Sequence, residues 1–310
     1  MSKIPVGATI AQAYRFAFGG FAQILRTIWL PWLILATSGF LLRSSTVALS
    51  TALTTRDFAN ISHLLIPMIP FYALTIILLF MQIAGITQLA LGIPTGSPYY
   101  YFSVGKPVWR LLGASLLVVA IFIGSYFLLL AGGILLGLIV GILGKLMGFS
   151  DLTRGVLAIA GVIVFIAAFG AYIYTLVRLT FFLNPVVIAE QRISFKQSWT
   201  LGSGNFWRIV VVMLAIIVPV IVVQLVLMFG FLAHGFPPTA PLHATADQIA
   251  ANRALVVAWN TDMIKRSNDY WYIIYPAYAV IAGLFYGLGC GAQCFAYRVL
   301  VPGEPSANRL

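Results

Sequence analysis

The sequence predicts an all-α protein, a polytopic bundle of six transmembrane helices, and three observations predict it. The 310 residues are 61% hydrophobic and 8% charged, whereas a soluble domain has about 45–50% apolar and about 25% charged residues. The mean hydropathy is +1.01. Six apolar segments reach the roughly 20 residues that a helix needs to cross a bilayer. This composition excludes a soluble enzyme, a disordered protein and a disulfide scaffold.

The six predicted spans belong to one integral membrane domain over residues 1–310. The first span is the weakest, because Arg43 interrupts it and Pro31 lies near its start. The third exceeds the roughly 30 Å apolar core, so it must tilt, project beyond the lipid or bend near Gly132–Gly133. The spans lie near residues 27–50, 64–93, 111–143, 156–183, 209–233 and 271–297.

The distribution of basic residues predicts the orientation and the partners. Six spans place both termini on one side, which has 11 of the 18 Lys and Arg residues, against seven on the other side. Because basic residues accumulate in cytoplasmic loops, we expect both termini to be cytoplasmic, in the inner membrane of a bacterium. The net charge of +11 is spread singly between apolar runs. This pattern favours anionic membrane lipids as partners and no nucleic acid.

Three spans begin in a similar way, with glycine, an aromatic residue and a basic residue. The pattern occurs at residues 19–26, 105–110 and 202–208, and it predicts three repeats of an interfacial helix plus a transmembrane hairpin. The alternative is that any polytopic protein carries such residues at its cytoplasmic interface. Aromatic and basic side chains favour headgroup depth. The candidate headgroup contacts are Arg26, Trp109, Arg110, Lys196, Trp207 and Arg208.

Two segments before these breaks have the periodicity of helices that lie on a bilayer surface. In residues 6–18, apolar side chains recur at helical spacing, opposite polar ones. In residues 194–201, the spacing places Phe195 and Trp199 on one face, with Lys196 and Ser198 turned away. An apolar face opposite a polar one is typical of an interfacial helix.

Part of the chain resembles a known family. The segments PVVIAE (185–190), SWTL (198–201) and GNFWR (204–208) are similar to a signature of the membrane domain of bacterial glycerophosphodiester phosphodiesterases and of its uncharacterised stand-alone integral membrane relatives. The six-span layout and the entry helix at 6–18 agree with that family. In the full-length phosphodiesterases the chemistry belongs to a separate soluble barrel, which this sequence lacks. The resemblance therefore implies a membrane module and carries over no catalytic residue.

Two rows of glycines at helical spacing predict close helix packing. Small residues let transmembrane helices approach each other without a hydrophobic driving force. Cys290 and Cys294 fall on the second row, where they act as small apolar residues or, alternatively, as metal or redox ligands. With no His or carboxylate nearby in the sequence, we expect no metal and no cofactor. The packing glycines are Gly133, Gly137 and Gly141 in the third span, and Gly283, Gly287 and Gly291 in the sixth.

Polar residues inside the spans are candidates for a cavity. Polar side chains in lipid need partners, and they often line a binding site. One interpretation is that these residues together form a pocket for a polar headgroup or a small solute. The other is that each one forms a hydrogen bond with a neighbouring helix, and the sequence does not decide between them. The possible cavity residues are Tyr275, Tyr278, Tyr286, Gln293, Gln82 and Gln224.

The longest connection, at about 234–270, is expected to contain an external amphipathic helix over 246–265. Thr245 and Gln248 have the spacing of a capping box, and residues 267–269 end the helix. The helix rests on the outer headgroups, covers an external cavity or docks another protein.

No catalytic set can be assembled from the sequence. The three histidines are separated, and no Asp, Glu, Lys or His lies in the middle of a span. We therefore expect no enzyme, but a non-catalytic multi-pass inner-membrane protein with a structural, regulatory or accessory role at the lipid bilayer. Its partners are membrane lipids and either another protein or further copies of itself. The alternative function is a carrier or channel for a lipid or a small uncharged solute.

Overall fold

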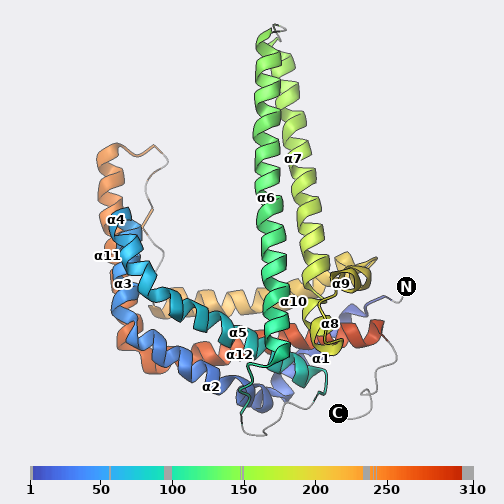
Figure 1. Ribbon diagram of the computed structural model, residues 1–310. Helices are drawn as coiled ribbons and strands as arrows, with labels where there is room; N and C mark the ends of the chain where they lie inside the picture. The colour runs from blue at the N-terminus through green and yellow to red at the C-terminus, as the bar shows by residue number, and fades with distance from the viewer. Residues whose placement is uncertain are drawn as a thin grey trace.

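The computed structural model describes residues 3–55, 57–93, 100–146, 148, 150–232, 238, 239, 241 and 243–301, and every regular element in them is helical (Figure 1). In this part of the chain six helices are long and apolar enough to cross a membrane, which confirms the predicted all-α bundle of a multi-pass membrane protein. They are Phe21–Leu41, Ala59–Ala90, Lys106–Leu146, Gly155–Ala189, Phe206–Gly230 and Trp271–Leu300.

The first third of the chain forms one hairpin with an extension at its tip. The predicted span 27–50 is too long at its end, because the helix ends at Leu41 and a new helix starts at Arg43. The sequence after Arg43 is rich in Ser and Thr, so it is poorly suited to lipid. The elements are α1 (Val6–Tyr14), a π-helical turn (Arg15–Gly19), α2 (Phe21–Leu41), α3 (Arg43–Thr55), α4 (Phe58–Leu65), a 3₁₀ turn (Ile66–Met68) and α5 (Ile69–Ala90).

The middle third forms the second hairpin. Its first helix, α6 (Lys106–Leu146), has 41 residues and no break at Gly132–Gly133, where a bend was one of three expectations. At 1.5 Å per residue it is roughly 60 Å long, about twice the bilayer core. The following elements are α7 (Asp151–Thr180), α8 (Leu183–Ala189) and α9 (Phe195–Gly202).

The last third contains α10 (Phe206–Leu227), a π-helical turn (Met228–Leu232), α11 (Ala246–Asp269) and α12 (Trp271–Leu300). The capping box of α11 is confirmed: the Gln248 backbone N–H donates to Thr245 Oγ1 at 3.3 Å, and the Thr245 N–H donates to Gln248 Oε1 at 2.9 Å. The helix continues four residues past the expected end at Lys265.

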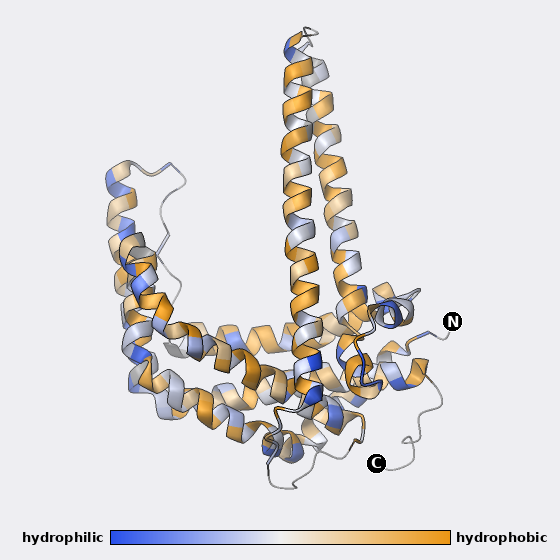
Figure 2. Cartoon of the chain, in the orientation of Figure 1, coloured by the Kyte–Doolittle hydropathy of each residue, from blue (hydrophilic) through white to orange (hydrophobic). Residues whose placement is uncertain are grey.

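Four helices run alongside one another and form the body of the molecule: α2, α5, α10 and α12 (Figure 1). The α6–α7 hairpin leaves this body near the two termini and projects away from it, and α3, α4 and α11 gather at the opposite end. Figure 2 shows that apolar residues cover most of the hairpin. Side chains along it are exposed, with Leu128 at 76%.

The two predicted surface helices exist, but both are packed against the protein. Thr9, Ala13 and Ala17 are buried where α1 and the turn after it pack on α12. On α9, the expectation that Ser198 turns away from the apolar face was wrong, because its side chain is fully buried and its hydroxyl donates to the Leu179 carbonyl at 2.7 Å. The helical spacing identified the helices, but a small hydroxyl can face the core when a carbonyl accepts its proton.

Each segment that enters a hairpin contacts the second helix of another hairpin. The α1 segment packs on α12, α9 packs on α7, and Tyr101, before α6, lies against Gly85 of α5. Burial raises the pKa of the Tyr101 phenol, and a hydrogen bond from Ser103 opposes this in part. Cyclic contacts of this kind are what a threefold repeat of entry segment plus hairpin would produce.

Candidate functional site

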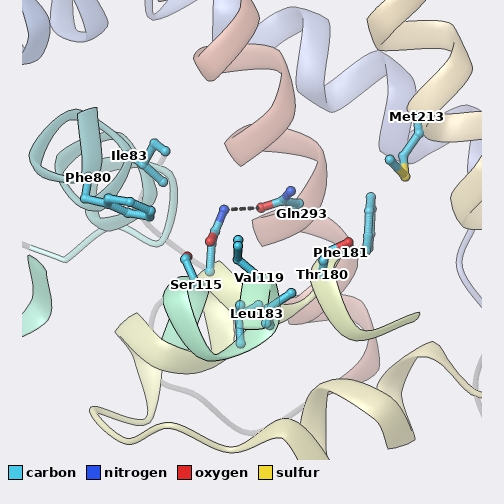
Figure 3. A pocket seen from close by; sticks show the side chains of 11 residues that line it. Phe80, Ile83, Ser115, Val119, Thr180, Phe181, Leu183, Met213 and Gln293 are labelled. Atoms are coloured by element: carbon cyan, nitrogen blue, oxygen red, sulfur yellow. Dashed lines mark hydrogen bonds between the residues drawn. The ribbon is translucent and has the colours of Figure 1, made fainter. Parts of the chain in front are cut away.

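A cavity of about 350 Å³ lies where the base of the α6–α7 hairpin meets the body (Figure 3). Six helices contribute to its lining, which is mostly apolar. Such a volume is near the lower end of the range of small-molecule sites. Representative lining residues are Phe80 and Ile83 of α5, Ser115 and Val119 of α6, Met213 of α10 and Gln293 of α12.

The cavity has one polar side, formed by two amides. Asn184 Nδ2, on α8, donates to Gln293 Oε1 at 3.1 Å, the bond drawn as a dashed line in Figure 3. An amide has two donor hydrogens and an acceptor oxygen, so this bond leaves the oxygen of Asn184 and the NH₂ group of Gln293 available for other bonds. Ser115 adds a hydroxyl, and none of the described lining residues carries a charge. The site therefore suits an uncharged group that both donates and accepts hydrogen bonds.

Three of the lining residues fix the depth of the cavity. Ile83 lies seven residues before the end of α5, Met213 seven after the start of α10, and Gln293 seven before the end of α12. These helix ends are the ones nearest the termini (Figure 1). At 1.5 Å per residue the cavity lies roughly 10 Å inside them. The three residues therefore lie in the halves of α5, α10 and α12 that are nearer the termini.

Of the six possible cavity residues, only Gln293 lines this cavity. Tyr275 contacts α2, where its hydroxyl oxygen is 3.0 Å from the position of a Cβ on Gly39. Tyr286 packs against a small cluster that includes Ile24 and Ile28. Gln82 is buried, with no partner for Oε1 in the described part of the chain. Tyr278 is half-buried and Gln224 is exposed, and neither is among the residues that line the cavity. The polar face predicted on α12 therefore identified one helix that lines the cavity, but it did not identify the other residues of the lining.

Sequence reasoning missed Asn184 and Ser115. Asn184 follows the fourth predicted span directly, in an apolar stretch before Pro185. A strongly polar amide in such a stretch was the signal that could have identified it. Ser115 has no comparable signal, since a serine in a transmembrane helix commonly bonds its own backbone.

Arg178 is the most buried charged residue described, with 6% of its surface exposed. It joins α7 to α9: one guanidinium nitrogen donates to Tyr174 Oη at 2.8 Å and another to the Trp199 carbonyl at 2.9 Å. Its guanidinium carbon lies 3.9 Å from the centroid of the Trp199 ring and 5.2 Å from that of Tyr174. Aromatic faces stabilise a buried cation in this arrangement.

Two more basic residues donate to backbone carbonyls. Arg298 donates to the Ala90 carbonyl at the C-terminal end of α5, at 2.7 Å, where the helix dipole favours a cation. Arg208 donates to the Ile4 carbonyl at 2.7 Å, and Asn205 Oδ1 accepts the Ile4 N–H at 3.0 Å. The GNFWR segment therefore clamps the chain before α1. The sequence predicted only a headgroup contact for Arg208, and the structure adds this bond to Ile4.

The remaining candidate headgroup residues surround the helix ends near the termini. Trp207 is 75% exposed, and Trp109, Arg26 and Lys196 are also exposed. Arg110 is half-buried. Their contact with lipid headgroups stays a prediction.

The two glycine rows have different surroundings. A Cβ on Gly283 would lie 2.8 Å from Ile28, on Gly287 it would lie 2.7 Å from Ile24, and on Gly291 2.9 Å from Phe16. At these glycines α12 lies close to α2 and to the segment after α1, so that an added Cβ would make the facing side chains of Ile28, Ile24 and Phe16 move. A Cβ on Gly133, Gly137 or Gly141 would meet nothing within 4 Å. Within the described residues, the α6 row is therefore not in close contact with another helix.

The two cysteines serve the contact between α12 and α5. Thr87 donates from Oγ1 to Cys290 Sγ at 3.5 Å, and Cys294 Sγ donates to the Thr87 carbonyl at 3.8 Å. Among the described residues, no three His, Cys, Asp or Glu side chains are grouped so that they could hold a metal ion.

Comparison with protein-family models, with curated proteins and with solved structures finds no match to this chain. The resemblance of residues 185–208 to the phosphodiesterase membrane domain therefore stays a prediction. What the structure adds is a physical role for these segments, since they include Trp199 and Ser198, which hold α9 on α7, and Asn205 and Arg208, which hold the chain before α1.

Proposed function

We propose that this multi-pass membrane protein has a non-catalytic structural, regulatory or accessory role at the bacterial inner membrane, with both termini in the cytoplasm. Its partners are anionic lipids and a further protein or a second copy of this chain. The family resemblance and the excess of basic residues on the side of the termini support this placement.

The observation that carries the proposal is the use of buried polar groups in helix packing. Arg178, Arg298 and Ser198 each donate to a backbone carbonyl of another element. Thr87 bonds both cysteines of α12. These bonds join separate helices and so stabilise a scaffold, although Nε of Arg178 and Nε of Arg298 have no partner among the described residues.

Native mass spectrometry of the protein, extracted gently with its own membrane, tests this role. The expected result is a stoichiometric complex with a partner protein or with a second copy, retained together with anionic phospholipid. A bare single chain would contradict the accessory role. Turnover of a substrate by the purified chain in proteoliposomes would contradict its non-catalytic character.

Contact with anionic headgroups can be tested separately at the ends of the helices. We expect charge reversal of Arg26, Arg110 and Lys196 to reduce binding to vesicles that contain phosphatidylglycerol, since each basic residue near such a surface contributes about 1 kcal/mol. Simultaneous reversal of the exposed Arg43, Arg253 and Lys265, on α3 and α11 at the opposite end of the body, changes the net charge by the same amount and is the matched control. Equal binding by the triple variant and the wild type would contradict this part of the proposal.

A carrier for a lipid or small uncharged solute is the second candidate function. The cavity at Asn184 and Gln293 favours it, because it is uncharged and is lined by six helices. The purified protein in vesicles would then accelerate the exchange of a labelled neutral lipid between the two leaflets. An exchange rate equal to that of protein-free vesicles would contradict the carrier function.

A further inference from the structure

We propose that the cavity at the hairpin base binds a single-chain, uncharged amphiphile of the monoacylglycerol type, with its hydroxyl headgroup against the amides of Asn184 and Gln293. The inference goes beyond the accessory role and holds whether or not the ligand is transported. It rests on the chemistry of the lining, on the cavity volume and on the exposure of one wall.

The lining selects against a charged headgroup. Among its described residues the cavity has no Lys, Arg or His to neutralise a phosphate, and no carboxylate to neutralise an amine. The nearest buried cation in sequence, Arg178, is held by Tyr174 and Trp199. An ion buried without a partner loses its hydration at high cost, whereas a hydroxyl or ester needs only hydrogen bonds. A neutral headgroup therefore fits and a phosphate does not.

The amide pair has the hydrogen-bonding groups that a glycerol headgroup needs. The oxygen of Asn184 can accept from a hydroxyl, while the NH₂ group of Gln293 can donate to a hydroxyl or an ester carbonyl. Ser115 provides a third group that can donate or accept. Because the Asn184–Gln293 bond joins α8 to α12, the two amides are held in position before a ligand arrives.

The volume and the exposed wall indicate a single chain. About 350 Å³ holds a small headgroup and the start of one acyl chain, and it is near the lower limit for drug-sized ligands. Val119, on the wall formed by α6, is 50% exposed. A chain can leave the cavity past Val119 and continue along the exposed apolar side of α6, next to Leu116 and Ile123.

The test uses the full chain in nanodiscs and a monoacylglycerol that carries a photoreactive diazirine near the start of its acyl chain. We expect the label on peptides that contain Phe80, Val118 or Val119. Unlabelled mono-oleoylglycerol should compete. Lysophosphatidylglycerol with the same chain should compete at least about tenfold less well, which corresponds to 1.4 kcal/mol of discrimination.

Two variants of α6 make the test specific. Ser115→Phe fills the cavity and should reduce labelling at least about tenfold. Ser125→Phe, ten residues further along the same helix and not part of the lining, should label like the wild type. Val119→Trp, at the exposed wall, is a second blocking variant that does not disturb a buried position. The unfolding temperature of both variants shows whether they are folded. If only Ser115→Phe has a lower unfolding temperature, the loss of labelling in Val119→Trp still reports a blocked site.

Three results would overturn the proposal. These are labelling that Ser115→Phe and Val119→Trp leave unchanged, labelling confined to peptides outside the lining, and equal competition by lysophosphatidylglycerol. The last would show that the site does not distinguish a phosphate from a hydroxyl. None of these outcomes bears on whether the protein assembles with a partner, so the site and the accessory role fail independently.

Discussion

The glycine rows of α12 and α6 have the same spacing in the sequence and opposite surroundings in the fold. On α12, Gly283, Gly287 and Gly291 lie directly against α2 and the segment after α1. On α6, Gly133, Gly137 and Gly141 face open space. In lipid, small residues permit two helices to approach but do not attract them unless a complementary surface is present. On the α12 side that surface exists, because Ala13 and Ala17 are small and Ile24 and Ile28 fill the remaining space.

The largest expected effect comes from adding volume to the α12 row. In Gly287→Val the side chain would collide with Ile24 and with Ala17, whose Cα is 3.5 Å from the added Cβ. Overpacking of this kind costs about 3 kcal/mol at the upper end of the usual range. Equilibrium unfolding in mixed micelles would measure the loss. A stability equal to that of the wild type would show that α1 and α2 can move away from α12 at little cost. The two glycine rows would then not differ in their tolerance of added volume.

The next effect concerns the base of the hairpin, where Arg178 connects α7 to α9. We expect Arg178→Gln to lower the free energy of unfolding by about 2 kcal/mol, because two hydrogen bonds from a charged donor and the stacking on Trp199 are lost. Limited proteolysis between α8 and α9 should become faster. Arg178→Lys is the control for charge: it should recover little stability, since an ammonium group lacks the planar fork of a guanidinium. Full recovery by Lys would mean that charge alone holds α9.

A smaller effect is expected where the chain before α1 is clamped. Asn205→Ala leaves the buried N–H of Ile4 without its acceptor, which costs about 1–2 kcal/mol. Hydrogen exchange in α1 should accelerate, because the segment before this helix loses one of the two side-chain contacts that hold Ile4. Asn205→Asp keeps an acceptor oxygen and should exchange more slowly than Asn205→Ala. Equal exchange in both variants would show that Arg208 alone is sufficient.

The smallest effect is expected on the open row. Gly137→Val meets no atom within 4 Å of the added Cβ, so the stability of the isolated chain should change by no more than about 0.5 kcal/mol. Unfolding under the same conditions as for Gly287→Val measures the difference directly. A large loss, or a change in oligomeric mass, would show that α6 packs against another molecule in the membrane, and the two rows would then be alike.

Local patterns predicted much of this fold. The six spans follow from runs of apolar residues, and the capping box of α11 follows from Thr245 and Gln248 three residues apart, since both depend on neighbours in sequence. The close packing of α12 was predicted from the spacing of its glycines alone. The same spacing on α6 predicted a contact that is not found among the described residues. The sequence could not show which helix faces which, and that decides whether a row is buried.

The candidate site was less predictable, because it depends on contacts between distant segments. Gln293 was found from its position on an apolar helix, but its partner Asn184 is 109 residues away. Asn205 and Arg208 form a conspicuous motif, yet their contact with Ile4 is visible only in three dimensions. Ser198 was assigned to the wrong face because helical spacing gives no information about a carbonyl on another helix, such as that of Leu179.

The clamp on Ile4 has a consequence for synthesis in the cell. The atoms that hold Ile4 belong to Asn205 and Arg208, and the bond to Asn205 spans 201 residues. At roughly 5–20 residues per second, a ribosome needs on the order of 10–40 s to add that length. During this time the first helix has left the ribosome while α10 and α12 are still missing. The nascent chain must therefore wait with its earliest segment undocked, exposed to insertion factors and proteases, until the fifth span enters the membrane.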